Sequence, residues 1–340
     1  MKAIAPGKLI LSGEHAVVYG RPALAMAIDR SAQVVVTPGE AAAGVEDGEV
    51  SFNLQNLSQS ERFTVRALRE LRHRVLRSYR QFLQGEIGIR EVLRKPVDLF
   101  EFSFIMLLDG LHLKLNRALD IRLQSNIPIG CGLGSSAASI LSVLRGVGHY
   151  FRVEFRPDWY YEYSLEAEKM QHGFPSGVDS YISVHGGCAK FQNGQAVRIP
   201  LPRTPIALVN TGTPSCTTGE CVAAVRQQFG SSGIWDEFEA VTLALEQALQ
   251  RNDTERIHAL IRENHRLLDA IGVVPPKVRE FIAEVEKTGG AAKICGAGAV
   301  SGENAGAVMI CGPRPSRELL DAFGYPLVPI RGEPLGVRIV

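Results

Sequence analysis

The chain has 340 residues, of which 45% are hydrophobic and 21% charged, and its formal net charge at pH 7 is +1. This length allows two domains with substantial cores. A nearly neutral chain argues against electrostatic binding of nucleic acid, and no apolar run reaches the ~18 residues that predict a membrane span.

The N-terminal segment begins with a predicted short strand, Lys2 to Ala5, and Pro6-Gly7 indicates a turn after it. Gly13-Glu14-His15 then places an acid and an imidazole directly before an apolar run, which favours a pocket wall over a solvated face. A lysine that follows a turn is ordinarily solvated, so Lys8 taken alone indicates no function.

Ala32 to Thr37 is a predicted strand, and two predicted helices follow it. Apolar residues recur at helical spacing between Gln59 and Gln84, with arginines filling the other face. Leu99 to Leu115 is a second, strongly apolar helix that we expect to pack against the first. An arginine-rich stripe is more often a solvated face than an interaction surface, although either helix could form the face of a homodimer.

The most informative stretch is Ile127 to Ala138, which lies between a predicted strand, Leu119 to Gln124, and a predicted helix, Ser139 to Val147. Glycines at 130, 132 and 134 allow a tight turn and a close approach to a ligand, because they carry no Cβ. Ser135 and Ser136 stand where the helix begins, with unpaired N–H groups pointing outward.

A glycine-rich loop that leads into a helix N-terminus can hold a phosphate group, and it can equally be a tight connection without a ligand. The loop lacks the Gly-Lys-Ser/Thr ending of a Walker A motif. It also has Ser135 where the third glycine of a dinucleotide fingerprint would stand. The loop therefore suggests phosphate binding without specifying the chemistry.

Pro157 to Met170 is a predicted helix that carries Glu168, and the loop after it presents Asp179 on the next element. Glu168 would by default be an exposed acid. An aspartate that follows a loop is most often an N-cap, so Asp179 has an ordinary structural interpretation as well.

Pro200 to Pro205 indicates a linker, so we expect one domain over residues 1–200 and a second over residues 201–340. The second half is predicted to contain strands and helices in alternation: strand Ile206 to Thr211, helices Phe238 to Gln250, Thr254 to Ala270 and Val278 to Thr288, and strands Ala291 to Cys295 and Ala307 to Cys311. The glycine-rich turn between the last two strands favours a β-loop-β unit over a helix-opening phosphate loop.

Six cysteines are scattered through the chain without C-x-x-C pairing. This pattern favours reduced thiols in a cytoplasmic protein over a disulfide frame or a zinc site. Cys131 and Cys295 both lie in glycine-rich loops, where we expect them to act as small space-filling residues.

Three segments together resemble the motifs of the GHMP small-molecule kinases: Ala5 to Lys8 with Gly13 to Gly20, Pro128 to Ala138, and Lys293 to Gly298. Gly13 to Val18 and Gly173 to Asp179 are most similar to the mevalonate kinase branch of that family. The resemblance covers nearly the whole chain. It implies an α+β fold of two domains, with an N-terminal half like ribosomal protein S5 domain 2, a ferredoxin-like C-terminal half and the active site in the cleft.

The resemblance also implies ATP- and Mg²⁺-dependent phosphorylation of the 5-hydroxyl of mevalonate, a step of isoprenoid precursor synthesis. Asp179 would deprotonate the attacking hydroxyl and Lys8 would lie between Asp179 and the γ-phosphate. Ser136 and Glu168 would hold magnesium, and Glu14 and His15 would contact the substrate. The residues implied to bind the nucleotide are Ser125, Gly130, Cys131, Gly132, Leu133, Gly134, Ser135 and Ser136. The third motif would close over the site.

Two segments depart from the family's pattern. The third motif continues as Ala299-Val300-Ser301-Gly302 instead of a longer glycine run, and Pro214 to Thr218 lacks the family's arginine. Thr217 or Thr218 could approach the substrate. Another GHMP kinase, such as a phosphomevalonate kinase or a kinase of a related alcohol or sugar, and a non-catalytic nucleotide-binding relative are the alternative interpretations.

Overall fold

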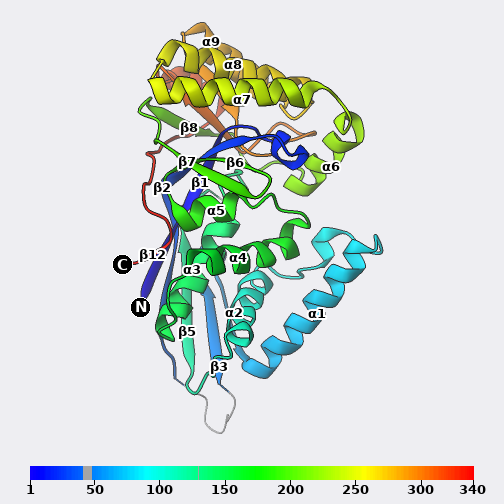
Figure 1. Ribbon diagram of the computed structural model, residues 1–340, viewed down its shortest axis with the longest axis vertical. Coiled ribbons are helices and arrows are strands. Elements are labelled where there is room, and N and C mark those ends of the chain that lie inside the picture. Colours follow the sequence, from blue (N-terminus) through cyan, green and yellow to red (C-terminus); the bar gives the residue numbers. More distant parts are fainter. Residues whose placement is uncertain (41–47, 129) are drawn as a thin grey trace.

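The computed structural model describes residues 1–40, 48–128 and 130–340, so Ile129 of the predicted phosphate loop lies outside the described residues. The fold contains a larger and a smaller sheet, one in each half of the elongated molecule in Figure 1. The strands of the larger sheet are β1 (Lys2–Ser12), β2 (Ala23–Pro38), β3 (Glu49–Leu54), β4 (Gln59–Thr64), β5 (Leu119–Ser125), β6 (Cys188–Gln192), β7 (Gln195–Ile199) and β12 (Arg338–Ile339). Those of the smaller sheet are β8 (Ile206–Asn210), β9 (Ala291–Ile294), β10 (Ala307–Cys311) and β11 (Leu327–Pro329).

The larger sheet has the strand order β12-β1-β2-β5-β3-β4, and the β6–β7 hairpin pairs with β2. Its strands pair antiparallel except for β3 and β5, which are parallel. The smaller sheet is antiparallel, with the order β11-β8-β10-β9. Sheets and helices are thus segregated, as an α+β fold requires.

Helices cover both sheets. Those of the first half are α1 (Val65–Leu83), α2 (Asp98–Gly110), α3 (Ser135–Tyr150), α4 (Pro157–His172) and α5 (Val178–His185). Those of the second half are α6 (Thr218–Phe229), α7 (Ile234–Arg251), α8 (Thr254–Ala270), α9 (Pro276–Lys287) and α10 (Arg317–Phe323). Short 3₁₀ turns span Ala16–Tyr19, Gln55–Leu57 and Ile89–Glu91. Among the helices of the described chain, none combines the length and apolar character needed to cross a bilayer.

Helix α3 is the central helix of the first half and packs directly on β1 and β2. A Cβ on Gly146 would lie 2.5 Å from Cγ1 of Val34, so the glycine lets the helix approach the sheet closely. Most side chains of α3 are buried, including Ile140, Leu144 and Val147. This packing fixes the N-terminal end of α3, which directly follows the glycine-rich loop. Burial of such aliphatic side chains contributes about 1.5–3 kcal/mol each to the free energy of unfolding.

Several predicted elements are confirmed and others are corrected. The helix predicted to reach Leu115 ends at Gly110. The helix Thr254–Ala270 and the strand Ala307–Cys311 are confirmed at the predicted bounds. The strand predicted to end at Ala5 continues to Ser12, because Pro6-Gly7 forms an irregularity in the β1–β2 register and not a turn. The helix predicted from Gln59 begins at Val65, since residues 59–64 form β4 against β3.

The two halves are joined by aromatic and polar contacts that α7 makes with β1, β6 and the 3₁₀ turn Ala16–Tyr19. Tyr19 stacks on Trp235 with ring centroids 4.0 Å apart, and Ser12 and Thr242 share a buried hydrogen bond of 2.7 Å. Lys190 on β6 pairs with Glu246 of α7 at 2.9 Å. These contacts hold α7 across β1.

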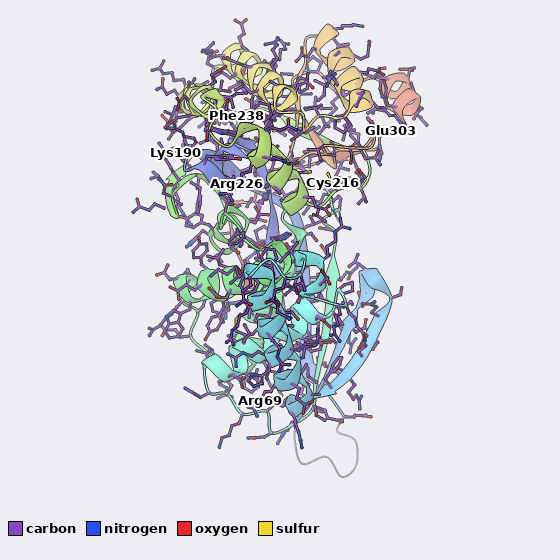
Figure 2. All side chains as sticks on the ribbon, turned by 90° about the vertical axis from the view of Figure 1, so that its right-hand side faces the viewer. Arg69, Lys190, Cys216, Arg226, Phe238 and Glu303 are labelled. Carbon is purple, nitrogen blue, oxygen red and sulfur yellow. The ribbon has the colours of Figure 1, made fainter. Side chains whose placement is uncertain are left out.

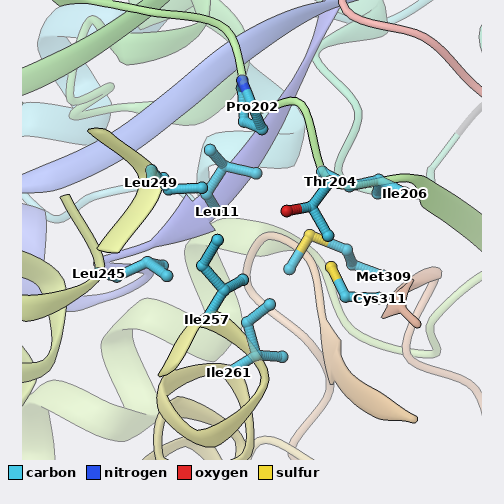
Figure 3. Close-up of a pocket in the computed structure, with 10 residues that line it drawn as sticks. All are labelled: Leu11, Pro202, Thr204, Ile206, Leu245, Leu249, Ile257, Ile261, Met309 and Cys311. Carbon is cyan, nitrogen blue, oxygen red and sulfur yellow. The ribbon is translucent and has the colours of Figure 1, made fainter. Parts of the chain in front are cut away.

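A small apolar cavity of about 10 Å³ lies near this junction, between the end of β1, the connection at residues 202–206 and the helices α7 and α8 (Figure 3). Its walls are the side chains of Leu11, Pro202, Thr204, Ile206, Leu245, Leu249, Ile257, Ile261, Met309 and Cys311. A void of this size has room for about one water molecule and offers almost no polar partner, so we treat it as a packing gap.

The end of the chain returns to the first sheet. Strand β11 pairs with β8 of the smaller sheet, and Gly332 then forms a bridge with Ile28 of β2. Strand β12 pairs with β1, placing Ile339 opposite Ala3. The two termini consequently lie near each other at one edge of the larger sheet (Figure 1).

Candidate active site

The glycine-rich loop turns through three glycines before helix α3. Gly130, Gly132 and Gly134 have φ of +73°, +72° and +71°, a region that other residues disfavour. A Cβ on Gly134 would lie 2.8 Å from Cγ of Lys8, and one on Gly132 would lie 2.7 Å from the carbonyl oxygen of Cys295. The loop is therefore in close contact with both β1 and the third glycine motif.

Helix α3 begins at Ser135, with Gly134 as its N-cap. This glycine has no side chain to accept hydrogen bonds from the first-turn amides, so those N–H groups can serve an anion. The positive end of the helix dipole adds to that preference. The arrangement has the features that the sequence predicts for a phosphate site.

Lys8 and Asp179 form an ion pair beside this helix start. Nζ of Lys8 lies 3.2 Å from Oδ1 of Asp179 and donates to the carbonyl oxygen of Gly132 at 3.0 Å. The backbone N–H of Lys8 also donates to Leu133 at 2.9 Å. Gly177 is the N-cap of α5, so Asp179 lies in its first turn and the N-cap interpretation of Asp179 is wrong. A carboxylate in the first turn is stabilised by the helix dipole.

Glu168 lies behind this pair and is almost completely buried. Its Oε2 accepts a 2.6 Å hydrogen bond from Ser180, and its Oε1 accepts one of 3.4 Å from Ser136. Burial and the neighbouring Asp179 raise the pKa of Glu168 to about 8. His172 completes the cluster, with Nε2 3.3 Å from Oγ of Ser136, and burial lowers the pKa of His172.

The donor set of this cluster fits a hard divalent cation. Oγ of Ser136 and Oε1 of Glu168 lie 3.4 Å apart and supply hydroxyl and carboxylate oxygens, the donors that such a cation prefers. The described residues contain no group of three or more His, Cys, Asp or Glu side chains arranged around one metal position. A cation at Ser136 and Glu168 would need oxygen ligands from outside the protein, which is how Mg²⁺ commonly binds at phosphate sites.

A cavity of about 630 Å³ opens in front of the glycine-rich loop and Asp179. One wall is apolar and comes from β3, β5 and the segment around α2, including Leu54, Leu99 and Leu123. Thr217, Thr218 and Gly219, at the start of α6, line the cavity as well. Of the predicted site residues, those that line the cavity are Ser125, Gly130, Cys131, Gly132, Leu133, Gly134, Ser135, Ser136 and Asp179.

Ser125 lies at the entrance to the glycine-rich loop and is tied to Asn56. The side-chain amide of Asn56 donates to the carbonyl oxygen of Ser125 at 2.8 Å, and its Oδ1 accepts from the Ser125 N–H at 2.7 Å. Oγ of Ser125 accepts from the N–H of Ile127 at 3.1 Å. Asn56 also lines the cavity, although its sequence surroundings gave no reason to select it.

Glu14 and His15 lie next to the third glycine motif and do not line this cavity. Glu14 is fully buried and forms an ion pair with Lys293 of β9, while burial raises the pKa of Glu14 against the opposing effect of that lysine. His15 has φ of +58°, and its Nε2 lies 2.9 Å from the carbonyl oxygen of Ala297. Glu14 thus joins the first half to β9, and His15 joins it to the turn at 296–298.

The third motif is confirmed as a strand-turn-strand unit, with β9 and β10 antiparallel. Its turn packs against the glycine-rich loop: a Cβ on Gly296 would lie 3.1 Å from Cα of Gly132, and the N–H of Ala307 donates to Cys131 at 3.2 Å. The second half of the molecule therefore supports the glycine-rich loop directly.

The two departures from the family's pattern contact each other. Oγ of Ser215 donates to the carbonyl oxygen of Ser301 at 2.8 Å and lies 3.1 Å from its hydroxyl. Thr217 is the N-cap of α6 and forms a capping box with Glu220, while Thr218 is the first residue of the helix. Both threonines line the cavity, so the choice between them stays open.

Two further residues of the site were missed in the sequence. His172 stands two positions after the predicted helix Pro157 to Met170, and its place before the Gly173 to Asp179 motif was an available signal. Lys293 begins the third motif, but a lysine in a strand gave no indication of its burial or of its pairing with Glu14.

Comparison with known proteins gives a consistent result. The family model described as GHMP kinases N terminal domain matches residues 103–187, and that described as GHMP kinases C terminal matches residues 245–301. The mevalonate kinase of Archaeoglobus fulgidus is 32% identical over 306 residues, which cover 88% of this chain and 89% of the relative.

Solved structures agree in fold. A crystal structure of mevalonate kinase superimposes with a TM-score of 0.79 at 25% identity, covering 98% of this chain and 99% of that one. The Methanococcus jannaschii mevalonate kinase also gives a TM-score of 0.79, at 24% identity and 98% coverage of both chains. The likeness thus extends over both sheets.

Proposed function

This chain belongs to the GHMP kinases and groups with the mevalonate kinases among them, and on that premise we propose that it transfers the terminal phosphoryl group of ATP to the 5-hydroxyl of mevalonate. The observation that carries the proposal is the ion pair of Lys8 and Asp179 at the start of α3, beside the 630 Å³ cavity. Phosphoryl transfer requires positioning and neutralisation of charge more than covalent participation by the protein.

In this proposal Asp179 orients the acceptor hydroxyl and takes its proton as the new bond forms. Its carboxylate lines the cavity, so it can reach a bound alcohol. Lys8 is held by both Asp179 and the carbonyl oxygen of Gly132, which directs its ammonium toward the place where transferred phosphate would lie. That position lets Lys8 stabilise negative charge on the transferred group.

The nucleotide phosphates are proposed to lie on the loop from Gly130 to Ser136, with Ser125 at the nucleotide side of the cavity. The N–H groups of the first turn of α3 would bind the phosphate oxygens. Ser136 and Glu168 would hold Mg²⁺, which neutralises phosphate charge when it is bound. Glu14 and His15 remain proposed substrate-side residues, and their contacts to Lys293 and Ala297 suggest that they act by supporting the wall of the site.

Three lesser proposals accompany this one. The division near residue 200 is supported by the two sheets, with the last residues returning to the first sheet. A cytoplasmic location is supported by the six free cysteines, a pattern usual for reducing compartments. The third is a homodimer through α1 or α2, which the molecular mass of the protein in solution would test.

The function is tested by measuring ADP release from purified protein with ATP, Mg²⁺ and mevalonate. We expect release that depends on all three, and ATP hydrolysis without mevalonate should be slow. A protein that binds ATP and releases no ADP with mevalonate would instead support another acceptor or the non-catalytic relative. Phosphomevalonate and a small set of alcohols and sugars, compared by kcat/KM, distinguish those alternatives.

A further inference from the structure

Cys216 and Cys221 flank Thr217, Thr218 and Gly219, three residues at the start of helix α6 that line the cavity. Cys216 precedes the N-cap Thr217, and Cys221 lies in the first turns of the helix. Figure 2 shows Cys216 close to the helix that carries Arg226, which is α6. The residues between the two cysteines include Thr217 to Gly219, which line the cavity.

The two sulfur atoms are 2.7 Å apart, although both cysteines are free thiols. A disulfide bond is about 2.05 Å long, so bond formation needs a movement of well under 1 Å. The two residues are only five positions apart, so the backbone at the start of α6 already holds their side chains together. This geometry is that of a dithiol site.

The two thiols differ in burial, and we therefore expect them to react in a fixed order with an oxidant. Cys216 is half-buried and is the thiol that an oxidant in solution meets first, whereas Cys221 is fully buried. Burial and the neighbouring Cys216 raise the pKa of Cys221 to about 12, so Cys221 is not the first to react with an oxidant in solution. Its proximity to Cys216 instead suits it to the second, intramolecular exchange, in which its proton passes to the departing glutathione thiolate.

Oxidation would alter a contact between α6 and the third glycine motif. The thiol of Cys221 donates to the carbonyl oxygen of Gly298 at 3.5 Å, and a disulfide sulfur carries no hydrogen to donate. The start of α6 is also held by the Ser215 contact to Ser301 and by a 2.7 Å ion pair between Arg90 and Glu220. Loss of the Cys221 contact would therefore weaken the attachment of α6 to the turn at 296–298. The new bond would at the same time link the residue before the N-cap of α6 to the first turns of the helix.

We propose that Cys216 and Cys221 form a reversible disulfide, a redox modification site next to the lining residues Thr217 to Gly219. The oxidant is a disulfide of the glutathione class. Cys216 displaces one glutathione thiol to give a mixed disulfide, and Cys221 then displaces the second, leaving the Cys216–Cys221 bond. Two electrons and two thiol hydrogens leave the protein, and one glutathione disulfide is reduced to two glutathione thiols.

The test counts thiols in the full chain after incubation with glutathione disulfide, by alkylation and peptide mass spectrometry. We expect the wild type to retain four of its six thiols, with Cys216 and Cys221 linked and both released by dithiothreitol. Cys216→Ser should keep all its remaining thiols. Cys221→Ser should instead accumulate a stable glutathione adduct at Cys216. A wild type that keeps all six thiols, or that stops at the mixed disulfide, overturns the proposal.

The effect on the cavity is measured separately and depends on the proposed function. We expect the KM for mevalonate to rise several-fold in the oxidised wild type and to stay unchanged in Cys216→Ser after the same treatment. An unchanged KM in the oxidised wild type would overturn the link between the disulfide and the cleft. The thiol count needs no turnover, so a protein inactive with mevalonate contradicts the proposed function without affecting the test of the thiol pair.

Discussion

The Asp179 carboxylate lines the cavity, whereas the Glu168 carboxylate behind it is buried and bonded to two serines. Because only Asp179 is accessible from the cavity, the two carboxylates suit different roles. A proton acceptor has to reach the substrate hydroxyl, while a cation ligand has to present a fixed oxygen atom. The side chain of Asp179 is 31% exposed, which leaves its free oxygen accessible to an acceptor.

Replacing Asp179 with asparagine tests this assignment. The Asp179→Asn variant keeps the size of the side chain but cannot accept the proton, so we expect turnover to fall by about 10²–10⁴-fold. Binding of ATP, measured by calorimetry, should persist because the glycine-rich loop is unchanged. Asp158→Asn, at an exposed first-turn position of α4, is the matched control and should keep normal turnover. Near-normal turnover in Asp179→Asn would remove Asp179 from the chemical step.

At the scale of single elements, the glycine-rich loop depends on backbone conformations that few residues other than glycine adopt. Gly134 and Gly85 both have positive φ, but a Cβ on Gly134 would meet Lys8 and one on Gly85 would meet nothing within 4 Å. We expect Gly85→Ala to lose about 1 kcal/mol of stability, and Gly134→Ala to lose more because its Cβ also meets Lys8. Only Gly134→Ala should also lose ATP affinity and turnover, because it displaces Lys8 and the start of α3. Equal ATP affinities in the two variants would contradict a phosphate-binding role for this turn.

Helix α2 contains a buried carboxyl group that makes stability depend on pH. Burial, with Asp98 and Glu61 nearby, raises the pKa of Glu101 from 4.5 to about 8. Between these values the unfolded chain releases the proton while the folded chain keeps it, so the free energy of unfolding falls as pH rises from about 4.5 to about 8. Below that range this group opposes folding least.

Glu101→Gln removes this titration. Between pH 5 and 8, the free energy of unfolding should fall less in the variant than in the wild type, and the difference should be on the order of 2 kcal/mol. Urea unfolding at several pH values provides the measurement, and Glu70→Gln on the exposed face of α1 is the control. Parallel stability curves for Glu101→Gln and the wild type would show that Glu101 does not titrate in this range.

The sequence predicted elements well where local pattern decides the structure. Helical spacing located α8, and turn residues located β10. It failed at Pro6-Gly7, which looked like a turn, because the pairing of β1 with β2 continues past it and only the register shifts. It also failed at residues 59–64, where pairing with β3 overrides a helix-like pattern.

In the candidate site too, contacts between motif residues could be predicted from the sequence, and contacts that depend on long-range packing could not. Motif residues that contact each other through one loop, such as Lys8 and Asp179 with Gly132, are brought together as the motifs imply. The pairing of Glu14 with Lys293 spans 279 positions, and neither residue carries a local signal of the other. Contacts of that kind follow only from the way the two sheets pack.

At the scale of the whole molecule, the Glu14–Lys293 pair joins the two halves in a fully buried position. Removing one partner leaves an unpaired buried charge, so we expect Lys293→Met to destabilise the protein by about 3–5 kcal/mol. The double variant Glu14→Leu/Lys293→Met should recover much of that loss. Lys287→Met, in an exposed pair with Glu284, should change stability by less than about 1 kcal/mol.

Thermal or denaturant unfolding of these variants separates a pair from two independent residues. Coupling appears as a double variant that is more stable than the sum of the single effects predicts. Additive effects of Glu14→Leu and Lys293→Met would contradict a joint role of the two side chains in fastening the halves.

We propose that ATP phosphorylates mevalonate in the cavity lined by the glycine-rich loop and the start of α6. The most direct test measures kcat/KM for mevalonate, phosphomevalonate and galactose with ATP and Mg²⁺, and identifies the product by mass spectrometry. We expect a phosphorylated mevalonate as product and a kcat/KM for mevalonate at least tenfold above either other acceptor, a difference of about 1.4 kcal/mol. A higher kcat/KM for phosphomevalonate or galactose, or no phosphorylated mevalonate, would contradict this proposal.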